Sequence, residues 1–207
     1  MTRGFFLALG WLTLACLTMP VVYTFWVSFS PGSFLSPPVG EWSLRWYRAF
    51  VDDGRWSSAL FRSLVIGVAS AGVALFAGVP LAFALGRHRF LGSKVLAGAV
   101  LLPACVPPAA LGMGMLPLLY MVNLWGNPVG LVLAHGLLSL PFTYLVAQTQ
   151  LGQINPDLEL AARGLGAGPW QTTLRVTLPL LRPALLAGSA AAFALSLNES
   201  MLALFLA

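Results

Sequence analysis

Charged residues are scarce in this chain of 207 residues. Only 8% of its side chains are Asp, Glu, Lys or Arg, whereas 58% are hydrophobic, and the mean hydropathy is +0.86. A soluble domain carries about a quarter charged residues, so the composition excludes an ordinary cytosolic enzyme, a disordered tail and a nucleic-acid-binding module. The longest segments without any charge are 4–40, 63–86 and 95–156. Because a membrane-spanning helix needs about 20 apolar residues, these segments hold one, one and two spans respectively.

Several kinds of chemical site are also missing. The two cysteines, Cys16 and Cys105, both lie inside apolar runs, which argues against a disulfide framework and against a zinc site. The sequence shows no paired carboxylates, no nucleophile–base constellation and no phosphate-binding glycine loop. Basic residues are not interleaved with aromatics, so no nucleic-acid partner is expected. We therefore predict no catalytic residues, no metal and no cofactor.

Five apolar segments are long enough to cross a membrane, at about 5–29, 62–86, 95–119, 129–149 and 183–206. The predicted fold class is therefore all-α, a polytopic membrane helical bundle with about five transmembrane helices. The first segment follows Arg3 and resembles a secretory signal, but its apolar run continues to about Phe29, which favours an uncleaved span. Prolines are tolerated inside membrane helices. The cluster of Pro103, Pro107 and Pro108 should nevertheless bend or interrupt the third span.

The basic residues divide unevenly between the loops. If the spans alternate, one side of the membrane holds Asp157 and Glu159 together with seven basic residues: Arg3, Arg87, Arg89, Lys94, Arg163, Arg175 and Arg182. The opposite side holds a balanced set of acidic and basic residues within the segment 30–60. The positive-inside rule makes the first side cytoplasmic, so we expect a multi-pass protein of the bacterial inner membrane with its N-terminus in the cytoplasm.

The external segment 30–60 is rich in Pro, Gly and Trp. Its aromatic residues suit a belt at the membrane–water interface, and stacking against a substrate is the alternative; they are Trp42, Trp46, Tyr47 and Trp56. We expect residues 1–60 to form the first transmembrane helix with this external segment. Residues 61–207 would form a transmembrane domain that contains a cytoplasmic segment at 150–182.

The cytoplasmic segment 150–182 has the pattern of a helix–turn–helix. Asn155 is suited to cap a helix that has Pro156 at its first position, and Gly166 is suited to end it. A second short helix would begin at Gly168 and end near Pro179. On the first helix, apolar residues recur at the spacing of one face, which the residues Leu158, Ala161, Ala162 and Leu165 form.

Two further features of this first helix bear on its role. Glu159 and Arg163 have the spacing of an ion pair within one helix. Leu160 points away from the apolar face, and an exposed leucine on a short capped helix suggests a surface for a partner. The alternative is an amphipathic helix that rests on lipid headgroups.

The residues of this segment match a known pattern. The stretch LELAARGLGA at 158–167, followed by VTLP at 176–179, resembles the EAA motif of bacterial ABC importer permeases, with the motif glycine at Gly166. Weaker matches resemble the spermidine/putrescine-type branch of these permeases. They cover Ser43–Tyr47, Leu101–Pro103 with Pro107, Ala134–Phe142 and Phe193–Glu199.

This resemblance implies that the chain is the permease subunit of an importer. Such a subunit pairs with a second permease subunit, binds a separate cytoplasmic ATP-binding cassette ATPase that hydrolyses the ATP, and receives its solute from a periplasmic or extracytoplasmic solute-binding protein. The chain itself would not be an enzyme. The EAA segment would be the coupling helix that docks on the ATPase, through Glu159, Leu160, Ala161, Ala162, Arg163, Gly166 and Pro179.

The sequence departs from the family pattern in three places. Leu160 stands where the motif has a glutamate, so we expect a hydrophobic contact there in place of a salt bridge to an ATPase arginine. Gln148–Gln150 lacks the basic residue that relatives carry before the loop. Family members also have a sixth span, so we expect this chain to be a fragment or a minimal variant.

Polar residues in the last span are the candidates for a solute pathway. An ionised side chain at mid-membrane costs about 2.5–3.5 kcal/mol on insertion scales, so Asn198 and Glu199 are expected to face a water-filled path, and a carboxylate there would suit a polyamine. The alternative is that Glu199 reaches the external interface or pairs with another subunit. His135 is expected to contact a neighbouring helix instead of binding a ligand.

The solute follows from the resemblance alone. We expect a polyamine-like solute, with iron, a phosphonate or another small solute as alternatives. Two other functions stay open at this stage: an intramembrane enzyme that uses His135, Asn198 and Glu199, or a structural subunit that transports nothing.

Overall fold

The computed structural model describes residues 2–32, 36–38, 40–88 and 90–207, so Arg89 of the expected cytoplasmic loop lies outside the described residues. These residues are predominantly helical and include no strand. The chain divides into two compact units, Met1–Phe61 and Arg62–Ala207. Helix α3 (Gly54–Arg87) begins in the first unit and continues into the second.

The first unit contains helix α1 (Thr2–Val27) and the short helix α2 (Arg45–Asp52). Helix α2 is amphipathic, because its charged residues fall on one face and Trp46, Tyr47, Phe50 and Val51 fall on the other. The end of α1 is tied to the start of α2. The hydroxyls of Ser28 and Tyr47 lie 2.7 Å apart, and the Phe29 ring lies 5.6 Å from the ring of Tyr47.

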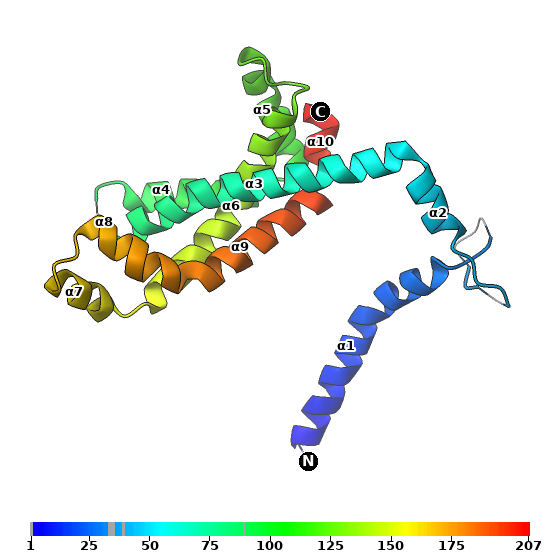
Figure 1. The fold of residues 1–207 in the computed structure, drawn as a ribbon, viewed down its shortest axis with the longest axis horizontal. Helices are drawn as coiled ribbons and strands as arrows, with labels where there is room; N and C mark the ends of the chain where they lie inside the picture. The colour runs from blue at the N-terminus through cyan, green and yellow to red at the C-terminus, as the bar shows by residue number, and fades with distance from the viewer. Residues whose placement is uncertain (1, 33–35, 39, 89) are drawn as a thin grey trace. The chain divides into compact units, whose positions relative to one another are not determined.

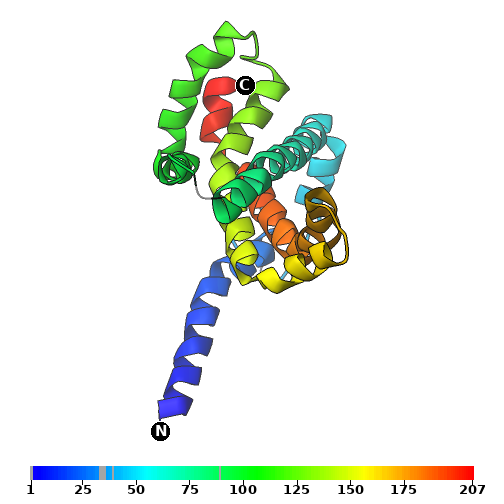
Figure 2. The same ribbon diagram turned by 90° about the vertical axis from the view of Figure 1, so that its left-hand side faces the viewer.

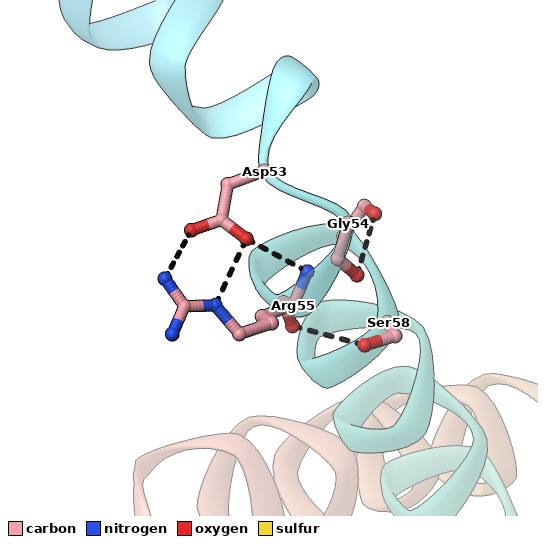
Figure 3. A network of polar contacts seen from close by, with 5 residues as sticks. Asp53, Gly54, Arg55 and Ser58 are labelled. Atoms are coloured by element: carbon pink, nitrogen blue, oxygen red, sulfur yellow. Dashed lines mark hydrogen bonds and ion pairs between the residues drawn. The ribbon is translucent and has the colours of Figure 1, made fainter.

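Asp53 joins α2 to α3, as Figure 3 shows. Its carboxylate accepts hydrogen bonds from the backbone N–H of Arg55 at 3.0 Å and from the Arg55 guanidinium at 3.0 and 3.2 Å. The side-chain hydrogen bond from Arg55, followed by the backbone one, lowers the pKa of Asp53 below its ordinary value. The Asp53 carboxylate thus accepts a backbone N–H group of the first helical turn, which would otherwise lack a partner. Helix α3 accordingly begins at Gly54, well before the expected start of the span at 62.

The second unit is built around helix α6 (Pro128–Gln153), whose buried residues extend from Gly130 to Leu151. Helices α3 and α9 (Leu178–Asn198) run alongside α6 (Figure 1). At one end of this unit the chain forms α7 (Pro156–Gly164) and α8 (Pro169–Thr172). At the other end α5 (Pro108–Met121) packs against α10 (Met201–Leu206), which Figure 2 also shows.

Small residues let these helices approach closely. Gly78 of α3 and Gly188 of α9 both lie against Thr143 of α6. Ala74 and Ala192 are fully buried. Gly188 and Ala192 thus serve helix packing, as small residues commonly do in membrane bundles.

The third span is broken, as the proline cluster predicts. Helix α4 (Ser93–Cys105) and α5 meet at an angle of 111° across Val106 and Pro107. In the part of the chain that the structure describes, four helices are long and apolar enough to cross a membrane, and the bent pair makes a fifth crossing if it counts as one span. The predicted all-α bundle of about five spans is confirmed.

The last span differs from its predicted form in two ways. Pro179 does not end a short second helix, because α8 continues through a π-helical turn, η1 (Thr173–Thr177), directly into α9. Pro179 is the second residue of α9, and the wider π-helical turn before it accommodates a ring that would otherwise meet the preceding carbonyls. The span is also interrupted after Asn198, because α10 starts only at Met201.

Candidate functional site

Helix α7 has the capped form that the sequence predicts. The side-chain oxygen of Asn155 accepts a hydrogen bond from the backbone N–H of Asp157 at 3.0 Å, and Pro156 occupies the first helical position. At the other end Gly166 adopts a left-handed conformation with φ of +89°, which a residue with a side chain rarely adopts. Both ends of this nine-residue helix are therefore fixed by local sequence.

The surface of α7 is largely uncovered. No residue of the helix is buried, and Leu160 is 62% exposed. The apolar face also remains open, since Leu165 just beyond the helix is 90% exposed and Trp170 in α8 is 72% exposed. Ala161 and Arg163 are exposed and Ala162 is half-buried. Leu160, Leu165 and Trp170 are thus large apolar side chains that α7, α8 and the turn between them leave exposed.

Glu159 is the one acidic residue of α7 that turns toward the rest of the unit. Its Oε1 atom accepts hydrogen bonds from Arg87 Nη2 and from the Thr177 hydroxyl, both at 2.9 Å. The side chains of Arg87 and Glu159 are only 25% and 17% exposed. The expected ion pair between Glu159 and Arg163 is wrong, because the carboxylate is already engaged by Arg87 and Thr177.

A row of polar side chains lies inside the unit, between α3, α6 and α9. His135 Nδ1 lies 2.8 Å from the Ser196 hydroxyl, and the Thr143 hydroxyl donates to the Ala74 carbonyl at 2.9 Å. The Ser139 hydroxyl donates to the Ala192 carbonyl at 3.4 Å. His135 is therefore a helix contact between α6 and α9, as expected. Its Nε2 atom is buried without a hydrogen-bond partner among the described residues.

Glu199 and Asn198 lie at the break between α9 and α10. Glu199 Oε1 accepts the backbone N–H groups of Met201 at 2.6 Å and Leu202 at 3.1 Å. The carboxylate thereby caps the first turn of α10, where a negative charge is favoured. Asn198, the last residue of α9, is exposed, and Glu199 is half-buried.

Sequence reasoning missed the partners of the polar residues. Arg87, Thr177 and Ser196 are each far along the chain from the residue that they bind, so no local spacing reveals the contact. One signal was available in the sequence. A polar residue within an apolar helix needs a hydrogen-bond partner when it is buried, so each such residue indicates that a partner exists without saying which one. Among the described residues, no group of three or more His, Cys, Asp or Glu could hold a metal ion.

Residues 78–207 match the family described as "Binding-protein-dependent transport system inner membrane component". A probable molybdenum ABC transporter permease protein of Haloferax volcanii is 37% identical over 72% of this chain. The chain spans only 59% of that relative. A putative 2-aminoethylphosphonate transport system permease protein of Salmonella typhimurium is 32% identical over 94% of this chain and 71% of its own length.

Two further similarities complete the comparison. The putrescine transport system permease protein PotI of Escherichia coli is 31% identical over 92% of this chain and 69% of its own length. The crystal structure of a bacterial ABC transporter involved in the import of alginate has a chain that matches with a TM-score of 0.71 at 22% identity. That match covers 94% of this chain and 70% of the other, and it shows a shared fold.

Proposed function

The chain belongs to the family of binding-protein-dependent transport system inner membrane components, and we propose that it acts as the permease subunit of an ABC importer. In this role it forms part of the solute pathway, pairs with a second permease subunit, and receives solute from a binding protein outside the membrane. A separate cytoplasmic ATPase supplies the energy. The observation that carries the proposal is the capped, uncovered helix α7 within the EAA-like segment.

The surface of α7 fits a protein partner better than it fits lipid headgroups. A headgroup-bound helix buries one apolar stripe and leaves its polar face in water. Here Leu160 and Leu165 are both widely exposed although they lie on different faces of the turn. A groove in a partner could cover both faces at once. We propose that Leu160 makes a hydrophobic contact with the ATPase where the family's glutamate would make an ionic one.

Substitution of Leu160 by Asp tests this role. Burial of a leucine contributes about 1.5–3 kcal/mol, so Leu160→Asp should reduce co-purification of the ATPase at least about ten-fold. Leu91→Asp is the matched control, because Leu91 is fully exposed in the loop between α3 and α4 and lies on the same proposed side. If Leu160→Asp leaves both ATPase binding and transport-coupled hydrolysis at the level of the control, the docking role is refuted.

For the solute we propose a small polyamine-like cation, handled near Asn198 and Glu199. The support is the carboxylate of Glu199 in the last span and the similarity to the putrescine permease protein. The relatives also include proteins named for molybdenum, 2-aminoethylphosphonate and sulfate. Titration of the cognate binding protein with putrescine, 2-aminoethylphosphonate, molybdate and sulfate discriminates these classes. Tight binding of an anion alone would overturn the polyamine assignment.

The proposed orientation places the N-terminus and α7 in the cytoplasm. Its support is the excess of basic residues in the loops on that side. Fusion of a periplasm-dependent reporter after Gly166 and after Gly40 tests it, with activity expected only for the fusion at Gly40. Activity after Gly166 would invert the topology.

A further inference from the structure

We propose that Glu159 is an internal tether that links the coupling helix α7 to α3 and to the π-helical turn before α9. This inference rests on the proposed function, since it concerns how a displacement of α7 by the ATPase reaches the membrane-spanning helices. In it, Glu159 does not touch the ATPase. It is a positioning residue that acts through Arg87 and Thr177.

The geometry of α7 makes such a tether necessary. Chain connectivity joins α7 to α6 at one end and, through residues 165–168, to α8 at the other. The helix has no buried residue, so it lacks a packed apolar face that would force its neighbours to follow its motion. Helix α3 has no chain connection to α7, since Arg87 precedes Glu159 by 72 residues.

The three tethered groups belong to three different elements. Arg87 is the last residue of α3, Glu159 lies in α7, and Thr177 ends the π-helical turn that leads into α9. A single carboxylate oxygen, Oε1, accepts from both Arg87 Nη2 and the Thr177 hydroxyl. Thr177 is only 1% exposed. A movement of α7 must therefore stretch both hydrogen bonds or carry α3 and the start of α9 with it.

The environment strengthens this contact relative to a surface ion pair. Surface pairs contribute little because water screens them and because two long side chains must be ordered. Here both side chains are about three-quarters or more covered, and charge-assisted hydrogen bonds are about twice as strong as neutral ones. Loss of the Glu159 carboxylate would leave the largely covered guanidinium of Arg87 without its compensating charge.

The π-helical turn is the part of the chain that the tether would displace. Such turns are weak points of a helix and often mark functional positions. The turn Thr173–Thr177 ends two residues before Pro179, so the ladder of backbone hydrogen bonds is already disturbed there. A pull on the Thr177 hydroxyl therefore acts at the point where α9 can pivot most easily.

The test uses the chain purified with its ATPase and its binding protein in lipid nanodiscs and proteoliposomes. Glu159→Ala and Arg87→Ala should leave the amount of co-purified ATPase unchanged but reduce solute uptake per ATP hydrolysed at least about five-fold, the low end of typical coupling. Glu159→Gln keeps one acceptor oxygen, which can still accept from both Arg87 and Thr177, but removes the charge, so it should show a smaller loss. Asp157→Asn is the matched control, because it removes an exposed charge from the same helix away from the tether.

A charge reversal separates the contact from a general effect on folding. The double variant Arg87→Glu with Glu159→Arg restores the pair in the opposite order and should recover part of the uptake per ATP that each single reversal loses. Full additivity of the two losses, with no recovery, would overturn the tether.

The remaining outcomes also decide the matter. If Glu159→Ala removes the ATPase from the complex, Glu159 is a docking residue and the inference is wrong. If Glu159→Ala and Arg87→Ala leave uptake per ATP at the level of Asp157→Asn, the inference is equally wrong. If the unaltered chain binds no ATPase at all, the proposed function itself fails, which the co-purification step reveals before any variant is compared.

Discussion

Two glycines of helix α3 should differ in their response to the same substitution. A Cβ atom added at Gly78 would overlap the hydroxyl of Thr143 and lie 3.1 Å from the backbone nitrogen of Tyr144, whereas a Cβ atom added at Gly72 meets nothing within 4 Å. The Thr143 hydroxyl is held by the Ala74 and Leu140 carbonyls, so it cannot turn aside without losing these contacts.

The magnitude follows from two terms. Replacement of Gly by Ala inside a helix gains about 1 kcal/mol of helix propensity, and this gain applies equally at both positions. Overpacking of a close contact costs about 1–3 kcal/mol, and it applies only at Gly78. Gly72→Ala should therefore stabilise the chain by up to about 1 kcal/mol, and Gly78→Ala should be less stable than Gly72→Ala by about 1–3 kcal/mol.

Reversible unfolding in mixed detergent–lipid micelles measures this difference, with helix content as the signal. The comparison between the two variants is more reliable than either value alone, because the propensity term cancels. Equal stability of Gly78→Ala and Gly72→Ala would refute the close approach of α3 and α6 at Thr143.

Three further predictions concern other parts of the chain. The lowered pKa of Asp53 means that its contribution to the first turn of α3 is complete above the pKa of the unfolded chain and is lost as the pH falls through the lowered folded value. The protection of the Trp56 amide, taken as its hydrogen-exchange rate relative to the intrinsic rate at the same pH, should therefore fall at acid pH, and Asp53→Asn should remove that pH dependence. Glu199→Ala should fray α10 at a cost of about 1 kcal/mol, measured by hydrogen exchange at Leu202, whereas Glu199→Gln should retain most of the cap; equal exchange in both variants would contradict the capping role. In a variant with Trp46 as its single tryptophan, lipids brominated near the headgroup should quench the tryptophan fluorescence, as an interfacial belt requires. Quenching by aqueous iodide alone would place α2 in water.

The helical class and the broken third span were predictable because both depend on local sequence. Long charge-free runs predict spans, and the cluster of Pro103, Pro107 and Pro108 predicts a break because proline removes hydrogen bonds wherever it stands. Asn155 and Gly166 were identified for the same reason, since caps are set by the residue itself. These features need no knowledge of what lies elsewhere in the bundle.

The contacts between distant residues were not predictable from local pattern. The spacing of Glu159 and Arg163 favours a pair within one helix, but such a pair is worth only a few tenths of a kcal/mol, and a better-covered partner, Arg87, outcompetes it. The predicted end of the second helix near Pro179 is also wrong. A proline usually ends a helix, and only the π-helical turn before it allows the helix to continue.

The two cysteines of the chain can report whether water reaches the sharp bend between α4 and α5. The last carbonyls of α4 have no partner within their helix, and hydrocarbon cannot satisfy them, so the bend must meet either protein or water. Cys105, free and exposed, is the last residue of α4, and the other free cysteine, Cys16, lies midway along α1. Because maleimides react with the thiolate, which needs water to form, the labelling rate of Cys105 relative to Cys16 reads directly whether water enters at the bend.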